Sequence, residues 1–151
     1  MYELGKLILQ KHYIPIVGQG KARWNNVHIE DLTKVYCALI DKAVAGDIDL
    51  ELFGAKGYIF VENGEHVWSE LATKIATEAY RSGYISEPKD YQLGKDEALK
   101  VAGFEAVSWG LNSRGKALRA RKFLDWQPTN ISIEEEVRNI LIQEKALLES
   151  K

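Results

Sequence analysis

The 151-residue sequence is short of cysteine, proline, methionine and net charge, with one Cys, three Pro, one Met and a formal net charge of −2. Because Cys37 is the only thiol, no internal disulfide can form, which favours a reducing compartment and a cytoplasmic protein. No apolar run approaches the roughly 20 residues that span a bilayer, and the first residues lack a secretory pattern. Nearly balanced charge argues against nucleic-acid binding. We therefore expect neither a membrane nor a nucleic-acid partner.

Metal and cofactor signatures are also missing. The histidines at 12, 28 and 66 have no metal-ligand spacing, and Cys37 falls on the apolar side of a predicted helix. A dinucleotide-binding turn needs three glycines between a strand and a helix, whereas Gly18-Gln19-Gly20 is followed by Lys21 and Ala22. We expect this chain alone to bind no metal and no nicotinamide cofactor.

What is present is the composition of a globular chain, 46% hydrophobic and 28% charged. This predicts one compact domain over residues 1–151. No internal repeat or low-complexity segment divides the sequence.

Hydrophobic periodicity predicts three long helices and one buried strand. Apolar residues recur at helical spacing over 30–45 and over 67–82, and Gly46 and Gly83 follow these two segments. A third helix over 132–147 begins at Ser132, where Ser-x-x-Glu forms a capping box. The short apolar run over 57–61, closed by a glycine turn, predicts a buried strand.

The other segments give weaker signals. Residues 4–8 show helical spacing, 13–17 an extended run, and 27–29 a strand-like Val-His-Ile. We predict a loop over 85–91, a short helix over 96–102, irregular structure over 104–112 and a helix over 114–124. Strands alternating with helices indicate an α/β fold that is mostly helical, with two or three short strands.

Two motifs then resemble a known family. Residues 24–32 join Val-His-Ile to an acidic helix start, and residues 121–128 end in Leu-Asp-Trp-Gln-Pro, similar to a Leu-Gly-Trp-x-Pro signature. Both resemble the extended short-chain dehydrogenases, the NAD-dependent epimerase and dehydratase family. The resemblance implies a partial Rossmann-type fold, and a C-terminal substrate-binding region whose N-terminal dinucleotide-binding domain is absent. It also implies NAD or NADP in the intact protein.

The resemblance implies candidate substrate contacts as well. In the family, an Asn-x-Arg-like opening of a helix lies at the rim of the substrate pocket, which corresponds here to Asn112 and Arg114. The segment 112–122 carries five cations and no acid, so a helix start here could bind an anion. Trp24 stands where related epimerases place an arginine, and this favours a carbonyl or aromatic substrate over a nucleotide sugar. His28 could contact substrate, although a structural role beside Asp31 is the more ordinary one.

Catalytic residues are not predicted. Tyr-x-x-x-Lys, the acid–base pair of the family, occurs as Tyr2/Lys6 and Tyr91/Lys95, but neither pair lies where the family places it. We expect a small-molecule-binding portion of an oxidoreductase or epimerase-like protein, inactive alone. The alternative is a non-enzymatic binding or assembly module, and exposed edges could drive self-association in either case.

Overall fold

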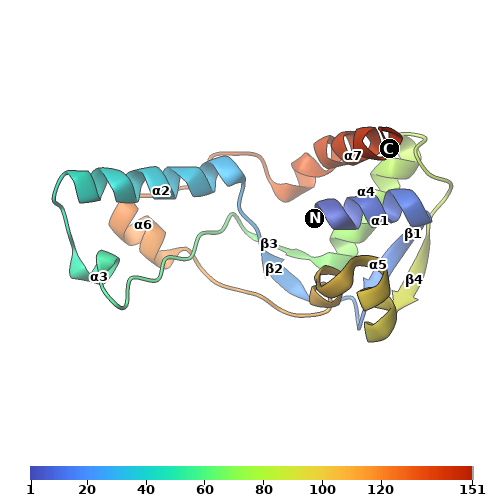
Figure 1. Cartoon of the computed structure of the whole chain (residues 1–151), viewed down its shortest axis with the longest axis horizontal. Helices are drawn as coiled ribbons and strands as arrows, with labels where there is room; N and C mark the ends of the chain where they lie inside the picture. The colour runs from blue at the N-terminus through green and yellow to red at the C-terminus, as the bar shows by residue number, and fades with distance from the viewer. Residues whose placement is uncertain (151) are drawn as a thin grey trace. The chain divides into compact units, whose positions relative to one another are not determined.

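The structure is a computed structural model that describes residues 1–150. Its strands are short: β1 (Tyr13–Val17), β2 (Arg23–Asn25), β3 (Glu65–Val67) and β4 (Lys89–Leu93). Its helices, shown with the strands in Figure 1, are α1 (Tyr2–Lys11), α2 (Ile29–Val44), α3 (Leu50–Phe53), α4 (Trp68–Arg81), α5 (Lys95–Ser108), α6 (Leu118–Leu124) and α7 (Ile133–Glu149). The expected α/β class, mostly helical with few short strands, is confirmed. Among residues 1–150, no helix is long and apolar enough to cross a membrane.

The chain divides into two compact units. Unit 1 comprises residues 1–24, 66–113 and 134–151, and unit 2 comprises residues 25–65 and 114–133. The chain passes from one unit to the other at β2 and β3, which pair with each other. We predicted that residues 1–151 act as one substrate-binding domain of an intact protein. That role stays a prediction.

Unit 1 is built around a parallel pair of strands. β1 pairs with β4 in register from Tyr13 opposite Lys89 to Val17 opposite Leu93, and α1, α4 and α5 contact β1. α7 belongs to the same unit, and a Cβ on Gly5 of α1 would lie 3.2 Å from Ile140 of α7. A side chain larger than hydrogen at Gly5 would therefore push the helices apart.

The core of unit 1 follows the helical periodicity of the sequence. The apolar stripe of α4 is buried, and the predicted helix over 67–82 is confirmed. The predicted helix start at residues 4–8 and the strand over 13–17 are also confirmed as α1 and β1. The fully buried large side chains of this unit are Leu4, Ile8, Leu71, Ile75, Leu93, Ile140 and Leu141.

Unit 2 has a smaller core under α2. Val35 packs with Ala117, Ala120 and Trp126, and partly buried apolar side chains surround them. The predicted helix over 30–45 is confirmed, but Tyr36 and Ile40, two of the apolar residues whose helical spacing predicts it, are exposed. Cys37 is exposed as well.

Two predicted strands are wrong. Residues 57–61 form no strand, and Tyr58 and Phe60 are exposed, because no other strand of unit 2 lies alongside to satisfy their backbone groups. Residues 27 and 28 form no strand either, although the backbone of His28 is extended. His28 caps α2 there, its Nδ1 accepting a hydrogen bond from the N–H of Glu30 at 3.2 Å.

Three other boundaries differ from the predictions. The predicted loop over 85–91 contains the start of β4, since pairing with the distant β1 overrides its polar composition. α5 continues through 104–108, beyond a break at Ala102 and Gly103, where irregular structure was predicted. The helix predicted over 114–124 begins only at Leu118. The last predicted helix is confirmed as α7, whereas the cap proposed at Ser132 stays a prediction.

Candidate functional site

One open groove that contains a predicted site residue, Arg114, lies in unit 2. It measures about 740 Å³ and lies beside the segment that precedes α6. Its lining combines two carboxylates, three cations and one apolar side chain with an amide and two glycines, namely Asn25, Glu62, Gly64, Glu65, Arg114, Gly115, Lys116, Leu118 and Arg121.

Glu62 organises one side of this groove. Its carboxylate accepts hydrogen bonds from the backbone N–H of Gly64 at 2.9 Å and of Ala117 at 3.2 Å, and from Arg121 at 2.8 Å. Burial raises the pKa of Glu62, but these hydrogen bonds and the Arg121 charge outweigh burial and hold the pKa below its usual range. Glu62 is therefore an anchored carboxylate that fixes residues 114–121 against the turn at Gly64.

Arg114 forms the opposite charged wall. Its Nε lies 2.7 Å from one Glu65 oxygen and its Nη2 3.1 Å from the other, a fork-to-fork ion pair. The backbone N–H of Gly115 donates to the side-chain oxygen of Asn25, whose Nδ2 donates to the carbonyl of Gly64 at 3.1 Å. Arg114 is thus held by a carboxylate and keeps more than half of its side chain exposed to the groove and solvent.

The groove carries a small excess of positive charge. Arg114 and Arg121 are matched by Glu65 and Glu62, while exposed Lys116 makes no ion pair within residues 1–150. Arg114 precedes α6 by four residues and lies in non-helical chain, so the expected helix start is not at Arg114, and the expected anion site stays a prediction. Binding of an anion here would rest on side-chain cations rather than on helix amides.

Asp31, in the first turn of α2, anchors this helix to residues 126–130. This fully buried carboxylate accepts hydrogen bonds from the backbone N–H of Asn130 at 3.0 Å and of Thr129 at 3.1 Å, and from Lys34 at 3.0 Å. Burial raises the pKa of Asp31, but these bonds outweigh burial and hold it far below its usual range. Trp126 also donates its indole N–H to the Asp31 carbonyl at 2.9 Å. The structural role expected for Asp31 therefore fits a network that joins α2 to residues 126–130.

The remaining predicted site residues lie elsewhere. In unit 1, the Asn112 side-chain oxygen accepts from the N–H of Arg23 at 2.9 Å, and the Trp24 indole donates to the carbonyl of Leu111 at 2.8 Å. Asn112 and Trp24 therefore both link residues 23–24 to residues 111–112. His28 belongs to unit 2 and caps α2. Their proposed contacts with substrate stay predictions.

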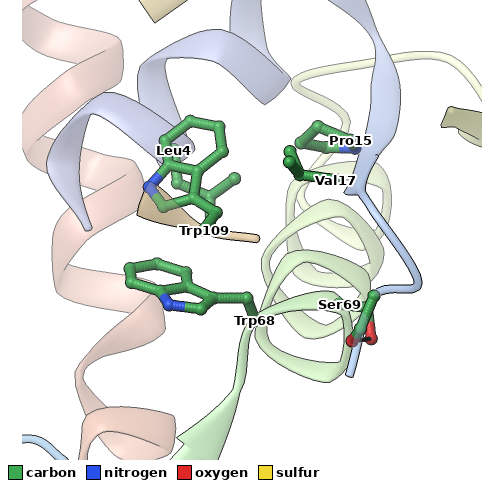
Figure 2. A pocket seen from close by; sticks show the side chains of 7 residues that line it. Leu4, Pro15, Val17, Trp68, Ser69 and Trp109 are labelled. Carbon is green, nitrogen blue, oxygen red and sulfur yellow. Dashed lines mark hydrogen bonds between the residues drawn. The ribbon is translucent and has the colours of Figure 1, made fainter. Parts of the chain in front are cut away.

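Unit 1 offers less room for a ligand than the groove of unit 2. Its open hollow beside α4 and α7 measures about 370 Å³ and is lined by Lys74, Thr77, Glu78, Arg81, Glu134, Glu135, Val137 and Arg138. A cavity of about 10 Å³ lies between Trp68, Trp109, Pro15 and Val17, and Figure 2 shows both indole nitrogens on the side away from Pro15 and Val17. Neither indole N–H has a hydrogen-bond partner within residues 1–150. Such a volume accommodates about one water molecule, so it cannot hold a substrate. Among the described residues, no three His, Cys, Asp or Glu side chains gather as metal ligands would.

The sequence pointed to the cations of the groove but missed its acids. Glu62, Glu65 and Asn25 were not singled out, although Glu62 begins the turn that ends in Gly64. The sequence did contain a signal for this pairing. Residues 112–122 have an excess of cations, and two acids, Glu62 and Glu65, flank the glycine turn, so the two segments have opposite charges that can pair. Proximity across about fifty residues could not be read from either segment alone.

Comparison with known proteins gives one informative match. The chain is 35% identical over 152 residues to oxidase ucsJ of Acremonium sp, in an alignment that covers 97% of this chain and 43% of that oxidase. This chain therefore spans less than half the length of that relative. No protein-family model matches the chain, and no solved structure matches it.

Proposed function

We propose that this chain is the substrate-binding portion of an NAD(P)-dependent oxidoreductase similar to the extended short-chain dehydrogenases, acting on a carbonyl or hydroxyl compound. The observation that carries the proposal is the 35% identity to an oxidase along almost the whole chain. The motifs at 24–32 and 121–128, which resemble that family, support the proposal. They favour a partial Rossmann-type fold whose cofactor-binding part is formed by residues outside this chain.

The groove of unit 2 is the proposed substrate site. A carbonyl or carboxylate oxygen of a substrate would be held by Lys116 and by the exposed part of Arg114, since charge-assisted hydrogen bonds are the stronger ones. Leu118 supplies apolar contact beside them. The fixed pair of Arg114 and Glu65 gives the guanidinium a defined orientation, which lowers the entropy cost of binding.

The turn at residues 18–20 lacks the form of a pyrophosphate-binding turn. Gly18-Gln19-Gly20 forms a turn between β1 and β2, and the chain continues as strand rather than as a helix with free N-terminal amides. Ser69 also donates to the carbonyl of Gly20 at 2.5 Å, and a Cβ at Gly20 would lie 3.1 Å from Ile16. This turn is packed against its own unit, so we assign no cofactor contact to it.

The test is a chimera in which these 151 residues replace the matching region of the Acremonium oxidase. We expect a folded chimera to retain oxidase activity, and Arg114→Ala in it to raise KM about 10–100-fold, as loss of one charge-assisted contact implies. Arg114→Lys should recover part of the loss. The matched control is Arg138→Ala, an exposed arginine of α7 in unit 1, which should leave KM unchanged.

Two results would contradict the proposal. A chimera that is folded by circular dichroism yet inactive would show that this region does not replace that of the oxidase. Equal KM values for the Arg114→Ala and Arg138→Ala chimeras would remove the groove as the substrate site.

The second candidate is a non-enzymatic binding or assembly module. The observation in its favour is the number of large apolar side chains that unit 2 exposes, including Ile29, Val44, Leu50 and Tyr58. An inactive but folded chimera, together with self-association of this chain, would favour this alternative.

A further inference from the structure

Phe60 lies at the edge of the groove of unit 2. The side chains of residues 57–61 alternate in burial. Ile59 and Val61 pack against the core of unit 2, whereas Phe60 is 62% exposed. A Cβ built on Gly115, which lines the groove, would lie 3.3 Å from Cδ1 of Phe60 and 3.5 Å from its Cγ. Because Gly115 has no side chain, the aromatic ring of Phe60 lies directly against the groove.

Two exposed apolar side chains therefore border this groove. Leu118, which lines it three residues after Gly115, is 66% exposed. The volume of about 740 Å³ lies within the range of small-molecule sites, which combine apolar surface with a few polar groups that orient the ligand. Phe60 and Leu118 supply apolar surface beside the charged groups of the groove, so a ligand with an apolar body would cover surface that is now exposed to water.

The charges of the groove indicate how much charge the ligand carries. Arg121 donates to Glu62 at 2.8 Å, and Arg114 donates to Glu65 at 2.7 Å. Lys116 is the third cation of the lining and leaves one positive charge in excess. One carboxylate balances this charge, whereas a phosphate dianion would add a second negative charge near Glu62 and Glu65. Such like-charge contacts disfavour the dianion.

We propose that the groove binds a monocarboxylate with an aromatic or alkyl body, and that Phe60 determines its specificity for that body. Lys116 and the exposed part of Arg114 hold the carboxylate through charge-assisted hydrogen bonds. The apolar body lies against Phe60 and Leu118. The inference rests on the proposed function, because it names the substrate class of the same groove, and it adds Phe60 to the residues that contact the substrate.

Titration of the 151-residue chain with phenylpropionate tests the ligand class. The backbone amide NMR shifts of Gly115 and Leu118 report binding at about pH 7.5, where this probe is a monoanion. A probe of this size should bind with a Kd in the millimolar range. Three matched probes should each bind at least about tenfold more weakly. They are acetate, which lacks the ring, phenylpropanol, which lacks the charge, and phenyl phosphate, which is a dianion.

Substitutions test the role of Phe60. Phe60→Ala should weaken phenylpropionate about tenfold, to the affinity of acetate, through loss of one aromatic contact, and Phe60→Leu should retain most of the affinity. Lys116→Gln should also weaken phenylpropionate at least about tenfold. The matched control is Phe104→Ala, the same change at a 72% exposed phenylalanine of α5 in unit 1, which should leave Kd unchanged. Dispersion of the amide spectrum checks that each variant is folded.

Equal affinities for phenylpropionate and acetate, or equal Kd values for the Phe60→Ala and Phe104→Ala chains, overturn the proposal. Binding of phenyl phosphate that is as tight as that of phenylpropionate overturns the monoanionic class. These outcomes are distinct from those of the chimera. If Arg114→Ala raises KM but the probes bind equally, the groove stays the substrate site and the ligand class is wrong. If the probes differ as expected but the chimera is inactive, the ligand class is supported and the oxidase role is contradicted.

Discussion

The two units use similar sequence patterns with different results. In unit 1, the apolar stripes of α1, α4 and α7 are buried, and α1 and α4 contact each other and β1. In unit 2, the equally periodic α2 buries little beyond Asp31 and Val35 and exposes Tyr36 and Ile40. Amphipathic periodicity therefore identifies a helix, whereas the number of neighbouring elements decides how much of its apolar surface is covered.

The cores of the units also differ in chemistry. Unit 1 is held mainly by large aliphatic and aromatic side chains, including the contact between Trp68 and Trp109 at 5.9 Å between ring centroids. Unit 2 depends on a buried carboxylate, Asp31, and on a partly buried ion pair between Glu62 and Arg121. We infer that unit 2 is stabilised by specific hydrogen bonds to a greater degree than unit 1.

The largest expected effect follows from Asp31→Ala. The substitution leaves the N–H groups of Thr129 and Asn130 without their acceptor, so unit 2 should lose about 3–5 kcal/mol of free energy of unfolding. Native-state hydrogen exchange of the α2 amides measures the loss. Asp41→Ala, at an exposed position of the same helix, should stay within about 0.5 kcal/mol of wild type. An equal loss of protection in α4 would contradict the inference that the hydrogen bonds of Asp31 stabilise unit 2 more than unit 1.

A somewhat smaller effect is expected from Ile75→Ala in unit 1. Ile75 is fully buried, so the cavity should lower the free energy of unfolding by about 2–5 kcal/mol. Hydrogen exchange of the α4 amides provides the measurement. Leu50→Ala in unit 2 is the matched control and should cost little, because Leu50 is exposed. Comparable losses in the two variants would contradict the assignment of the dense core to unit 1.

The smallest effect concerns pH. Burial lowers the pKa of His66 below its usual 6.5, and the N-terminus lowers it further, while Glu134 opposes the shift. The unfolded chain then binds the proton more readily, so this contribution to unit 1 is present above pH 6.5 and is lost as pH falls through the folded pKa. In unit 2, Asp31 and Glu62 have lowered pKa values, and their contribution is lost only below about pH 4, the unfolded range of carboxyl groups.

Hydrogen exchange between pH 7 and pH 4.5 should therefore show a loss of protection in α4 before α2. The unfolding equilibrium must first be separated from the known pH dependence of exchange chemistry, for which His66→Gln serves as control. If α2 loses protection first, or if the His66→Gln variant keeps the same pH dependence, then His66 is not the cause of the pH dependence of unit 1.

Local patterns predicted the helices well and the strands poorly. α2, α4 and α7 were predictable within a residue or two, because each carries its periodicity and its stop signals in one segment. β4 was missed because its residues are polar and its partner β1 is about seventy residues away. Residues 57–61 have the composition of a strand but lack a neighbour within unit 2, which no local pattern could show.

The candidate site was predicted in part for the same reason. Arg114 and Lys116 stood out as members of a cation cluster, and Arg114 does line the groove. Glu65, which orients Arg114, and Glu62, which binds Arg121, lie about fifty residues earlier in the sequence. Asn112 and Trp24 instead form hydrogen bonds that link residues 23–24 to residues 111–112 in unit 1.

The sequence by itself determined the positions of the main helices, the missing disulfide and the glycine turns, because these depend on residue types within a few positions of one another. Only the tertiary structure decided that the cations near α6 are paired with acids, that Asp31 is buried, and that the face of α2 with Tyr36 and Ile40 is exposed. Charge pairing and burial depend on which distant segments meet, and that is a property of the whole fold.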